Sequence, residues 1–204
     1  MKALLLTAEI MVKRSVGSIW LLWLCGFLPA AVAAVSPVDT LPGKLVSLAV
    51  CLPGVFLLTG WHGSRARTGL MAILFRTEGA GTVRFSELLL PTLSGTILGA
   101  MAGMAASFPP TWQFWLVLPL SAFAVSALID SAERRYRYPG RFLLGLLWLH
   151  GASESGGGSL LAPFLYPGKV LMPGEAAPHP DSFVLASLAL AGVSAGIYSL
   201  SCRR

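Results

Sequence analysis

The chain has 204 residues, of which 55% are hydrophobic and only 12% are charged, and its formal net charge is +6. A soluble domain carries about 25% charged residues, so the composition argues against an ordinary soluble protein. It also argues against nucleic-acid binding, because the basic residues gather at the ends of apolar stretches, where anionic lipid head groups would meet them.

Six apolar stretches are long enough to be membrane-crossing helices, since a hydrocarbon core ~30 Å thick takes about 20 residues per helix. In chain order they are Ser18–Val35, Leu41–Gly60, Leu90–Phe108, Trp112–Ile129, Phe142–Leu165 and Phe183–Ser201. Together they cover more than half of the chain. We therefore predict an all-α integral membrane protein whose residues 1–204 form a single transmembrane domain.

The basic residues lie mostly on one side of these predicted spans. They are Lys2, Lys13, Arg14, Arg65, Arg67, Arg76, Arg84, Arg134, Arg135, Arg137, Arg141, Arg203 and Arg204. Only Lys44 and Lys169 fall on the other side. Positive charge marks the cytoplasmic face, so we predict that both termini lie inside and that the chain resides in the inner, or cytoplasmic, membrane of the cell.

The N-terminal residues carry two competing signals. Ala3–Val12 reads as a short amphipathic helix in the membrane interface. The apolar run that follows, with Ala31–Ala34 at its end, resembles a signal peptide with a small-residue cleavage site. Because the charged lead-in is long and the run is nearly of transmembrane length, we expect it to be retained. Cleavage would leave five spans and a new N-terminus outside.

The gap between the second and third spans, Trp61–Leu89, is too polar to cross the bilayer. Its apolar residues nevertheless recur at helical spacing, at Leu70, Ile73, Leu74, Leu88 and Leu89. Gly79 and Gly81 divide it into two short pieces. We predict a broken amphipathic element on the cytoplasmic face. Such an element either rests on lipid or docks to a soluble partner, and periodicity does not separate the two.

Glycines recur every fourth residue in two of the predicted spans, at Gly95, Gly99 and Gly103 and again at Gly192 and Gly196. This spacing places them on one face of a helix, where a second helix can approach closely. We predict that they are helix-packing positions.

The fifth span is irregular, with His150, Ser153 and Glu154 before a run of three glycines. An ionisable group at membrane depth is costly, so we treat these three residues as functional candidates. We interpret Gly156–Asp181 as a partly re-entrant outer segment between the fifth and sixth spans. Alternatively, the span ends near Ser153 and Glu154 lies among head groups.

No residue pattern indicates catalysis by this chain. Gly151–Ser155 lacks the last glycine of the G-x-S-x-G nucleophile turn. The three histidines cannot share a metal, since His62 and His179 are predicted at opposite faces. No G-x-x-x-x-G-K-[ST] sequence occurs. We therefore expect no enzyme activity, no metal site and no cofactor bound by this chain.

Three short segments resemble the permease subunits of ABC type-2 exporters: Glu78–Thr82, Leu88–Thr92 and Ile97–Gly99. They match an E-x-G-T-like turn, a short helix with paired leucines and a small-residue third span. The six-span layout, the inside termini, the interfacial N-terminal helix and the re-entrant outer hairpin also resemble that family. The chain departs from it in having Leu93–Gly95 where a basic residue often stands, and in its short outer loops.

The resemblance implies cytoplasmic coupling helices that dock to a separate P-loop ATPase subunit, in which ATP and Mg²⁺ would bind. The docking and gating candidates are Arg65, Arg67, Arg76, Glu78, Gly79, Gly81, Thr82 and Glu87. It also implies a second permease half, identical or different, that pairs through the first and fifth spans and completes the substrate path. The path candidates under this resemblance are His150, Ser153 and Glu154. Cargo and direction stay open. The alternatives are a non-transport membrane scaffold or assembly subunit that recruits a cytoplasmic partner, and a membrane enzyme acting on lipid.

Overall fold

The computed structural model describes residues 5, 6, 9, 49, 50, 53, 54, 57, 58, 69, 72–74, 76, 79–105, 112–135 and 180–202. Apart from Gly79 and the turn at Cys202, this part of the chain is helical and contains no strand. Three long helices are described in full: α5 (Ala80–Ala105), α6 (Trp112–Arg135) and α9 (Pro180–Ser201). The predicted first and fifth spans and nearly all of the re-entrant segment lie outside the described residues.

The three helices are long and apolar enough to cross a membrane, over Gly81–Met104, Trp112–Arg134 and Val184–Ser201. They coincide with the third, fourth and sixth predicted spans. This agreement supports the prediction of an all-helical membrane protein.

The N-terminal boundary of α5 differs from the prediction. The sequence places the third span at Leu90, with a separate short helix before it, but α5 is continuous from Ala80. Of the two predicted breaks only Gly79 has a left-handed backbone, with φ +84°, a conformation that costs little for glycine alone. The N–H of Val83 donates to the Gly79 carbonyl at 3.4 Å and closes the first turn. Helix α5 therefore begins directly after Gly79.

Helix α6 also extends beyond its predicted span, which ends at Ile129. It continues to Arg135 and so takes Asp130 and Arg134 into the helix. These two side chains form an ion pair four residues apart on α6, an arrangement that stabilises a helix locally. Charge at these positions therefore does not end the helix.

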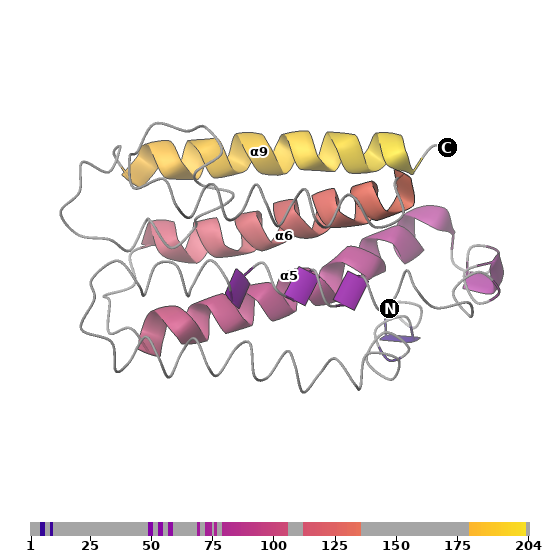
Figure 1. The fold of residues 1–204 in the computed structure, drawn as a ribbon, viewed down its shortest axis with the longest axis horizontal. Coiled ribbons are helices and arrows are strands. Elements are labelled where there is room, and N and C mark those ends of the chain that lie inside the picture. The colour runs from indigo at the N-terminus through magenta and orange to yellow at the C-terminus, as the bar shows by residue number, and fades with distance from the viewer. Residues whose placement is uncertain are drawn as a thin grey trace.

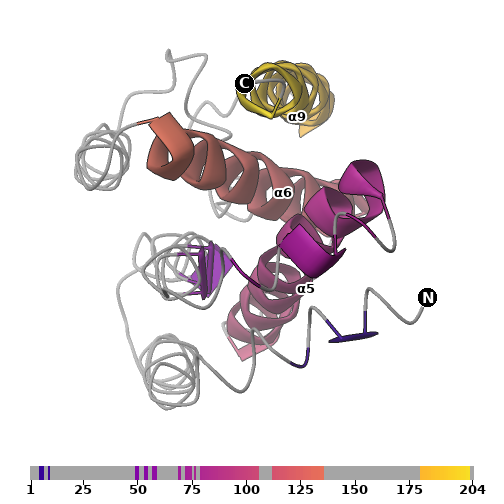
Figure 2. The same ribbon diagram turned by 90° about the vertical axis from the view of Figure 1, so that its right-hand side faces the viewer.

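Helix α6 lies between α5 and α9 and contacts both of them (Figures 1 and 2). Along the bundle α5 runs opposite to α6, whereas α9 runs in the same direction as α6 (Figure 1). We call the end of the bundle where α5 begins and where α6 and α9 finish the basic end. The parallel course of α6 and α9 is what one further crossing between them, the predicted fifth span, requires.

The glycines of α5 face its neighbours at very short range. A Cβ built at Gly95 would lie 2.5 Å from the Val50 carbonyl oxygen, and one built at Gly99 would lie 2.5 Å from the Cγ2 of Val50. One built at Gly103 would lie 2.6 Å from the Cζ of Phe114. Only glycine, which has no Cβ, leaves room for neighbouring atoms to come this close.

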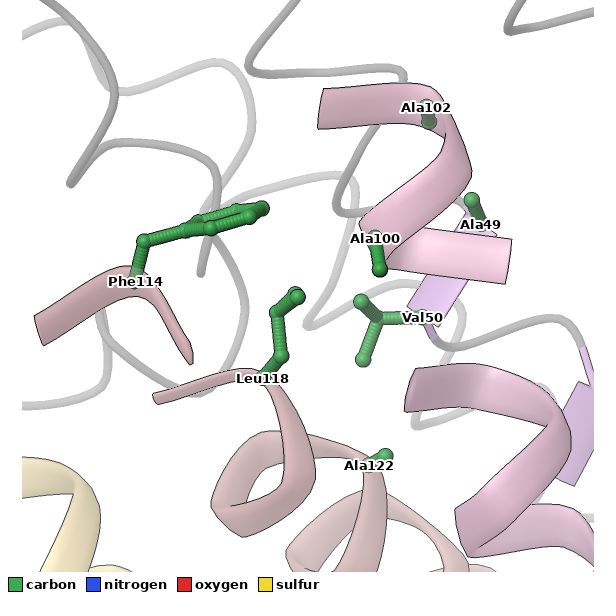
Figure 3. Close-up of a cluster of buried hydrophobic side chains, with 7 residues drawn as sticks. All are labelled: Ala49, Val50, Ala100, Ala102, Phe114, Leu118 and Ala122. Atoms are coloured by element: carbon green, nitrogen blue, oxygen red, sulfur yellow. The ribbon is translucent and has the colours of Figure 1, made fainter. Parts of the chain in front are cut away.

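We call the side of α5 that carries Gly95, Gly99 and Gly103 the glycine face. It forms part of a small-residue core between α5, α6 and the residues before α5 (Figure 3). The buried side chains of this core are Ala49, Val50, Ala100, Ala102, Phe114, Leu118 and Ala122. Alanine predominates, so the helices lie close together and dispersion contacts replace the hydrophobic effect as the source of attraction inside a bilayer.

Six described residues within the predicted second span are helical and buried: Ala49, Val50, Pro53, Gly54, Leu57 and Leu58. They recur in pairs four residues apart, which is the spacing of one helix face. The Oγ of Ser126 on α6 lies 3.0 Å from a Cβ built at Gly54. This part of the second span therefore packs against both α5 and α6.

Helix α9 packs on α6 through small residues and through Leu190, which lies against Ala124. Ala191 and the hydroxyl side chains of Ser187 and Ser194 are buried, and among the described residues no hydrogen-bond partner reaches either hydroxyl. The outward face is apolar and consists of Leu185, Leu188, Val193, Ile197 and Leu200. Such a face suits contact with lipid.

Gly192 and Gly196 lie on this outward face of α9 and are exposed. In the described part of the structure, nothing lies within 4 Å of a Cβ built at either position. Neither α5 nor α6 packs against these two glycines, although they were predicted to be helix-packing positions. The glycines of α5, in contrast, do have close neighbours.

Two exposed tryptophans mark the end of the bundle opposite the basic end. Trp112 and Trp115 occupy the first turn of α6 and are 62% and 44% exposed. Tryptophan is enriched where a helix enters the head-group region. Their position fits a membrane boundary at this end of α6.

The glycine face of α5 gives the first prediction. Gly95→Val should lower the free energy of unfolding by about 1–3 kcal/mol, because the new side chain would overlap a backbone oxygen that cannot rotate away. Gly192→Ala is the matched control, since its Cβ enters open space and alanine favours helix over glycine by up to ~1 kcal/mol. Unfolding midpoints in mild detergent test both variants, and equal midpoints for Gly95→Val and wild type would contradict the packing argument.

Candidate functional site

A buried ion network joins α5 and α6 at the basic end. The Nη2 of Arg134 lies 2.5 Å from the Oε2 of Glu87, and its Nε lies 2.6 Å from the Oδ2 of Asp130. Both carboxylate side chains are 0% exposed, while the arginine side chain is 19% exposed. We call these three residues the ion network.

The two carboxylates reach the arginine by different routes. Asp130 lies one turn before Arg134 on α6, so this pair forms within one helix. Glu87 comes from α5, and its bond to Arg134 crosses between helices. Asp130 therefore orients the guanidinium, and Glu87 joins α5 to it.

Helix α9 contacts the same arginine through an aromatic ring. The guanidinium carbon of Arg134 lies 5.7 Å from the centroid of the Tyr198 ring, within the range of a cation–π interaction. The Tyr198 hydroxyl donates a hydrogen bond of 3.1 Å to the backbone carbonyl of Arg84 on α5. Tyr198 thus contacts both other helices, and all three helices meet at Arg134.

A second polar contact fastens the end of α9 to α6. The Oγ of Ser201 lies 3.4 Å from the Oγ of Ser131, at the long end of hydrogen-bonding distance. Ser131 donates its proton to the Ala127 carbonyl, and Ser201 shares its single proton between the Tyr198 carbonyl at 2.8 Å and this longer contact. The bonds from Glu87 to Arg134 and from Tyr198 to Arg84, together with this serine contact, thus all lie at the basic end.

Pairing is what makes charge tolerable at this depth. A buried carboxylate or guanidinium loses several kcal/mol of hydration, and this loss is recovered only through close, hydrogen-bonded partners. Each described member of the network has such a partner. The network can therefore hold helices together, but it offers no unpaired acid or base for chemistry.

An exposed helical face lies just beyond the start of α5, at the basic end (Figure 1). Gly69, Ala72, Ile73 and Arg76 are helical and exposed, whereas Leu74 between them is buried. Their spacing of three, four and seven residues is that of one helix face. Ile73 is 62% exposed. We call these four residues the exposed face.

The predicted docking residues divide into exposed and buried positions. Arg76, Gly79, Gly81 and Thr82 are exposed at the basic end. Glu87 is instead fully buried in the ion network, so in this structure it contacts α6 rather than a surface partner. The other predicted docking residues, Arg65, Arg67 and Glu78, lie outside the described residues, as do the path candidates His150, Ser153 and Glu154.

Sequence reasoning missed the partners of Glu87. Asp130 and Arg134 read as part of a basic gap after the fourth span, and Tyr198 as an ordinary residue of the sixth. The available signal was the acid and base four residues apart at the end of an apolar helix, since such a pair can extend the helix. The described residues contain no group of three or more His, Cys, Asp or Glu side chains that could hold a metal ion.

Comparison with known proteins adds no identity: no protein-family model, no curated protein and no solved structure matches this chain.

The ion network gives the second prediction. Arg134→Met should lower the free energy of unfolding by about 3–5 kcal/mol, because two buried carboxylates would lose the arginine that pairs with them. The matched control is the triple variant Glu87→Gln, Asp130→Asn, Arg134→Met, which removes all three charges together and should recover most of the loss. Denaturant titration in mild detergent measures both. A triple variant no more stable than the single one would mean that the arginine acts by packing rather than by charge.

Proposed function

We propose that this chain is the transmembrane permease subunit of an ATP-driven ABC exporter in the cytoplasmic membrane. In this proposal it forms a substrate path with a second permease half, identical or different, and is coupled to a separate P-loop ATPase subunit. ATP and Mg²⁺ bind in that subunit, and this chain performs no hydrolysis itself.

The observation that carries the proposal is the exposed face at the basic end. It presents an apolar side chain, two small residues and a cation on one side of a helix, beyond the membrane-crossing part of α5. A soluble protein can take such a face into a groove, with the apolar residue as anchor. The positive-inside rule assigns this end to the cytoplasm, which is where an ATPase subunit would be.

The directions of the helices support the same proposal. Helix α5 leads away from the basic end and α6 and α9 lead back to it (Figure 1), as six spans with both termini inside require. The turn at Gly79 joins the exposed face to α5. A displacement of the exposed face by a partner would therefore be passed to a membrane-crossing helix.

The mechanism follows from this connection. ATP binding draws the ATPase subunits together, and the docked faces move with them. The nucleotide shifts the permease between inward-open and outward-open states only as far as it binds one state better than the other. His150, Ser153 and Glu154 remain the candidates for contact with cargo in this proposal.

One observation favours the second candidate, a non-transport scaffold that recruits a cytoplasmic partner. Within the described helices, Leu88–Ala105, Trp112–Ile129 and Phe183–Ser201 contain no charged residue. In α5 and α6 the charges lie toward the basic end, whereas the one charged residue of α9, Asp181, lies in its first turn at the opposite end. A scaffold needs no polar path across the membrane, so it would have this distribution.

The third prediction concerns the exposed face. Ile73→Ser should reduce the amount of P-loop ATPase that co-purifies with the chain from mild detergent, because it removes the apolar anchor of the docking helix. Ile197→Ser is the matched control: it also replaces an exposed isoleucine, but on the outward face of α9. It should leave co-purification unchanged.

Quantitative mass spectrometry of the purified complexes provides the measurement. Recovery of a correctly inserted wild-type chain with no P-loop ATPase would reject the permease proposal. Recovery of a different cytoplasmic protein through the same face would favour the scaffold.

A further inference from the structure

We infer that Glu87 is a positioning residue: through Arg134 it holds the first part of α5, and with it the exposed face, in a fixed place against α6 and α9. The inference deepens the proposed function and rests on it in one respect, namely that the exposed face is a docking surface. The positioning itself depends only on contacts within this chain.

Helix α5 has a weak point directly after Glu87. Pro91 lies inside the helix and has no N–H to donate to the carbonyl four residues earlier, which is that of Glu87. A proline inside a helix breaks the hydrogen-bond ladder at this place and commonly bends the helix. The part of α5 before Pro91 can therefore change direction relative to the part after it.

The two parts of α5 are held by different interactions. After Pro91, the glycine face packs directly against Val50, Leu118 and Phe114. Before Pro91, the described bonds to other helices are polar: the Glu87 carboxylate to Arg134 and the Arg84 carbonyl to the Tyr198 hydroxyl. Val83 and Leu88 are buried there, but Phe85 is 59% exposed. The polar contacts thus fix the direction of the first part.

The exposed face follows the direction of this first part. It precedes α5 by the short connection through Gly79, whose backbone is left-handed. A shift of the first part of α5 therefore moves the exposed face relative to the ends of α6 and α9. Conversely, a partner that displaces the exposed face would strain the bond between Glu87 and Arg134.

The network contains its own control residue. Asp130 contacts the same guanidinium as Glu87, at a similar distance and with the same complete burial. Asp130 belongs to α6, however, so its bond cannot hold α5. If Glu87 acts by positioning, neutralising Glu87 and neutralising Asp130 must have different effects on the exposed face.

The test measures the distance between two spin labels by pulsed electron paramagnetic resonance in lipid nanodiscs. The labels are attached at Ala72→Cys on the exposed face and Ser199→Cys on α9, both exposed positions. Native Cys25, Cys51 and Cys202 are first replaced by alanine. We expect Glu87→Gln to shift and broaden the distance distribution, and Tyr198→Phe and Asp130→Asn to broaden it less, because both of these variants keep the bond between Glu87 and Arg134.

Two outcomes overturn the inference. One is an unchanged distribution in folded Glu87→Gln and Tyr198→Phe proteins. The other is an equal shift in Asp130→Asn, which would indicate a general loosening of the bundle. Should Glu87→Gln fail to fold, Glu87→Asp decides the question, because it keeps the charge and shortens the side chain that reaches Arg134.

Co-purification of the P-loop ATPase, measured on the same variants, separates this inference from the proposed function. A shifted distance in a chain that binds no ATPase supports the positioning role and rejects the permease proposal. An unchanged distance in a chain that binds the ATPase rejects the positioning role and supports the permease proposal.

Discussion

A guanidinium group removed from water needs carboxylates beside it, and this requirement brings three helices together at Arg134. Helix α6 supplies the arginine and one acid, α5 supplies the second acid, and α9 supplies the aromatic ring. Away from this point the helices meet through small residues and through apolar side chains such as Phe114 and Leu118, which allow close approach but form no directional bonds. The ion network is therefore the contact that fixes how the three helices are arranged at the basic end.

The sequence predicted the existence of these helices well, because length and apolarity alone decide whether a segment can cross a bilayer. It also placed Gly95, Gly99 and Gly103 on one face, since a spacing of four residues requires this in any helix. It could not name their neighbours: Val50 and Phe114 come from separate segments, and periodicity gives the face of a helix but not what lies against it. The same limit explains Gly192 and Gly196, which have the same spacing and face outward.

The sequence-based prediction was least accurate for charged residues near the ends of helices. Charged residues near a predicted span were assigned to the cytoplasmic gaps, and so Glu87 and Asp130 were placed outside the membrane-crossing helices. In the structure each is neutralised by Arg134 and remains helical and buried. The partner of Asp130 is four residues away on the same helix, but the partner of Glu87 is 47 residues away in the sequence, and no local pattern reports that pairing. The residues that the resemblance assigned to the path lie outside the described part of the chain, so that assignment stays a prediction.

The close contact between Gly95 and the Val50 carbonyl oxygen has a consequence for how the protein is made. A growing chain leaves the ribosome from its N-terminus and folds in that order, so the segment around Val50 is available before α5 has been synthesised. When α5 enters the bilayer, its glycine face can therefore pack at once against the segment around Val50. Helix α6 then packs against both of them through Phe114 and Leu118. Arg134 is synthesised after Glu87 and before Tyr198, so the acid of α5 is neutralised only once α6 arrives, and α9 completes the assembly last.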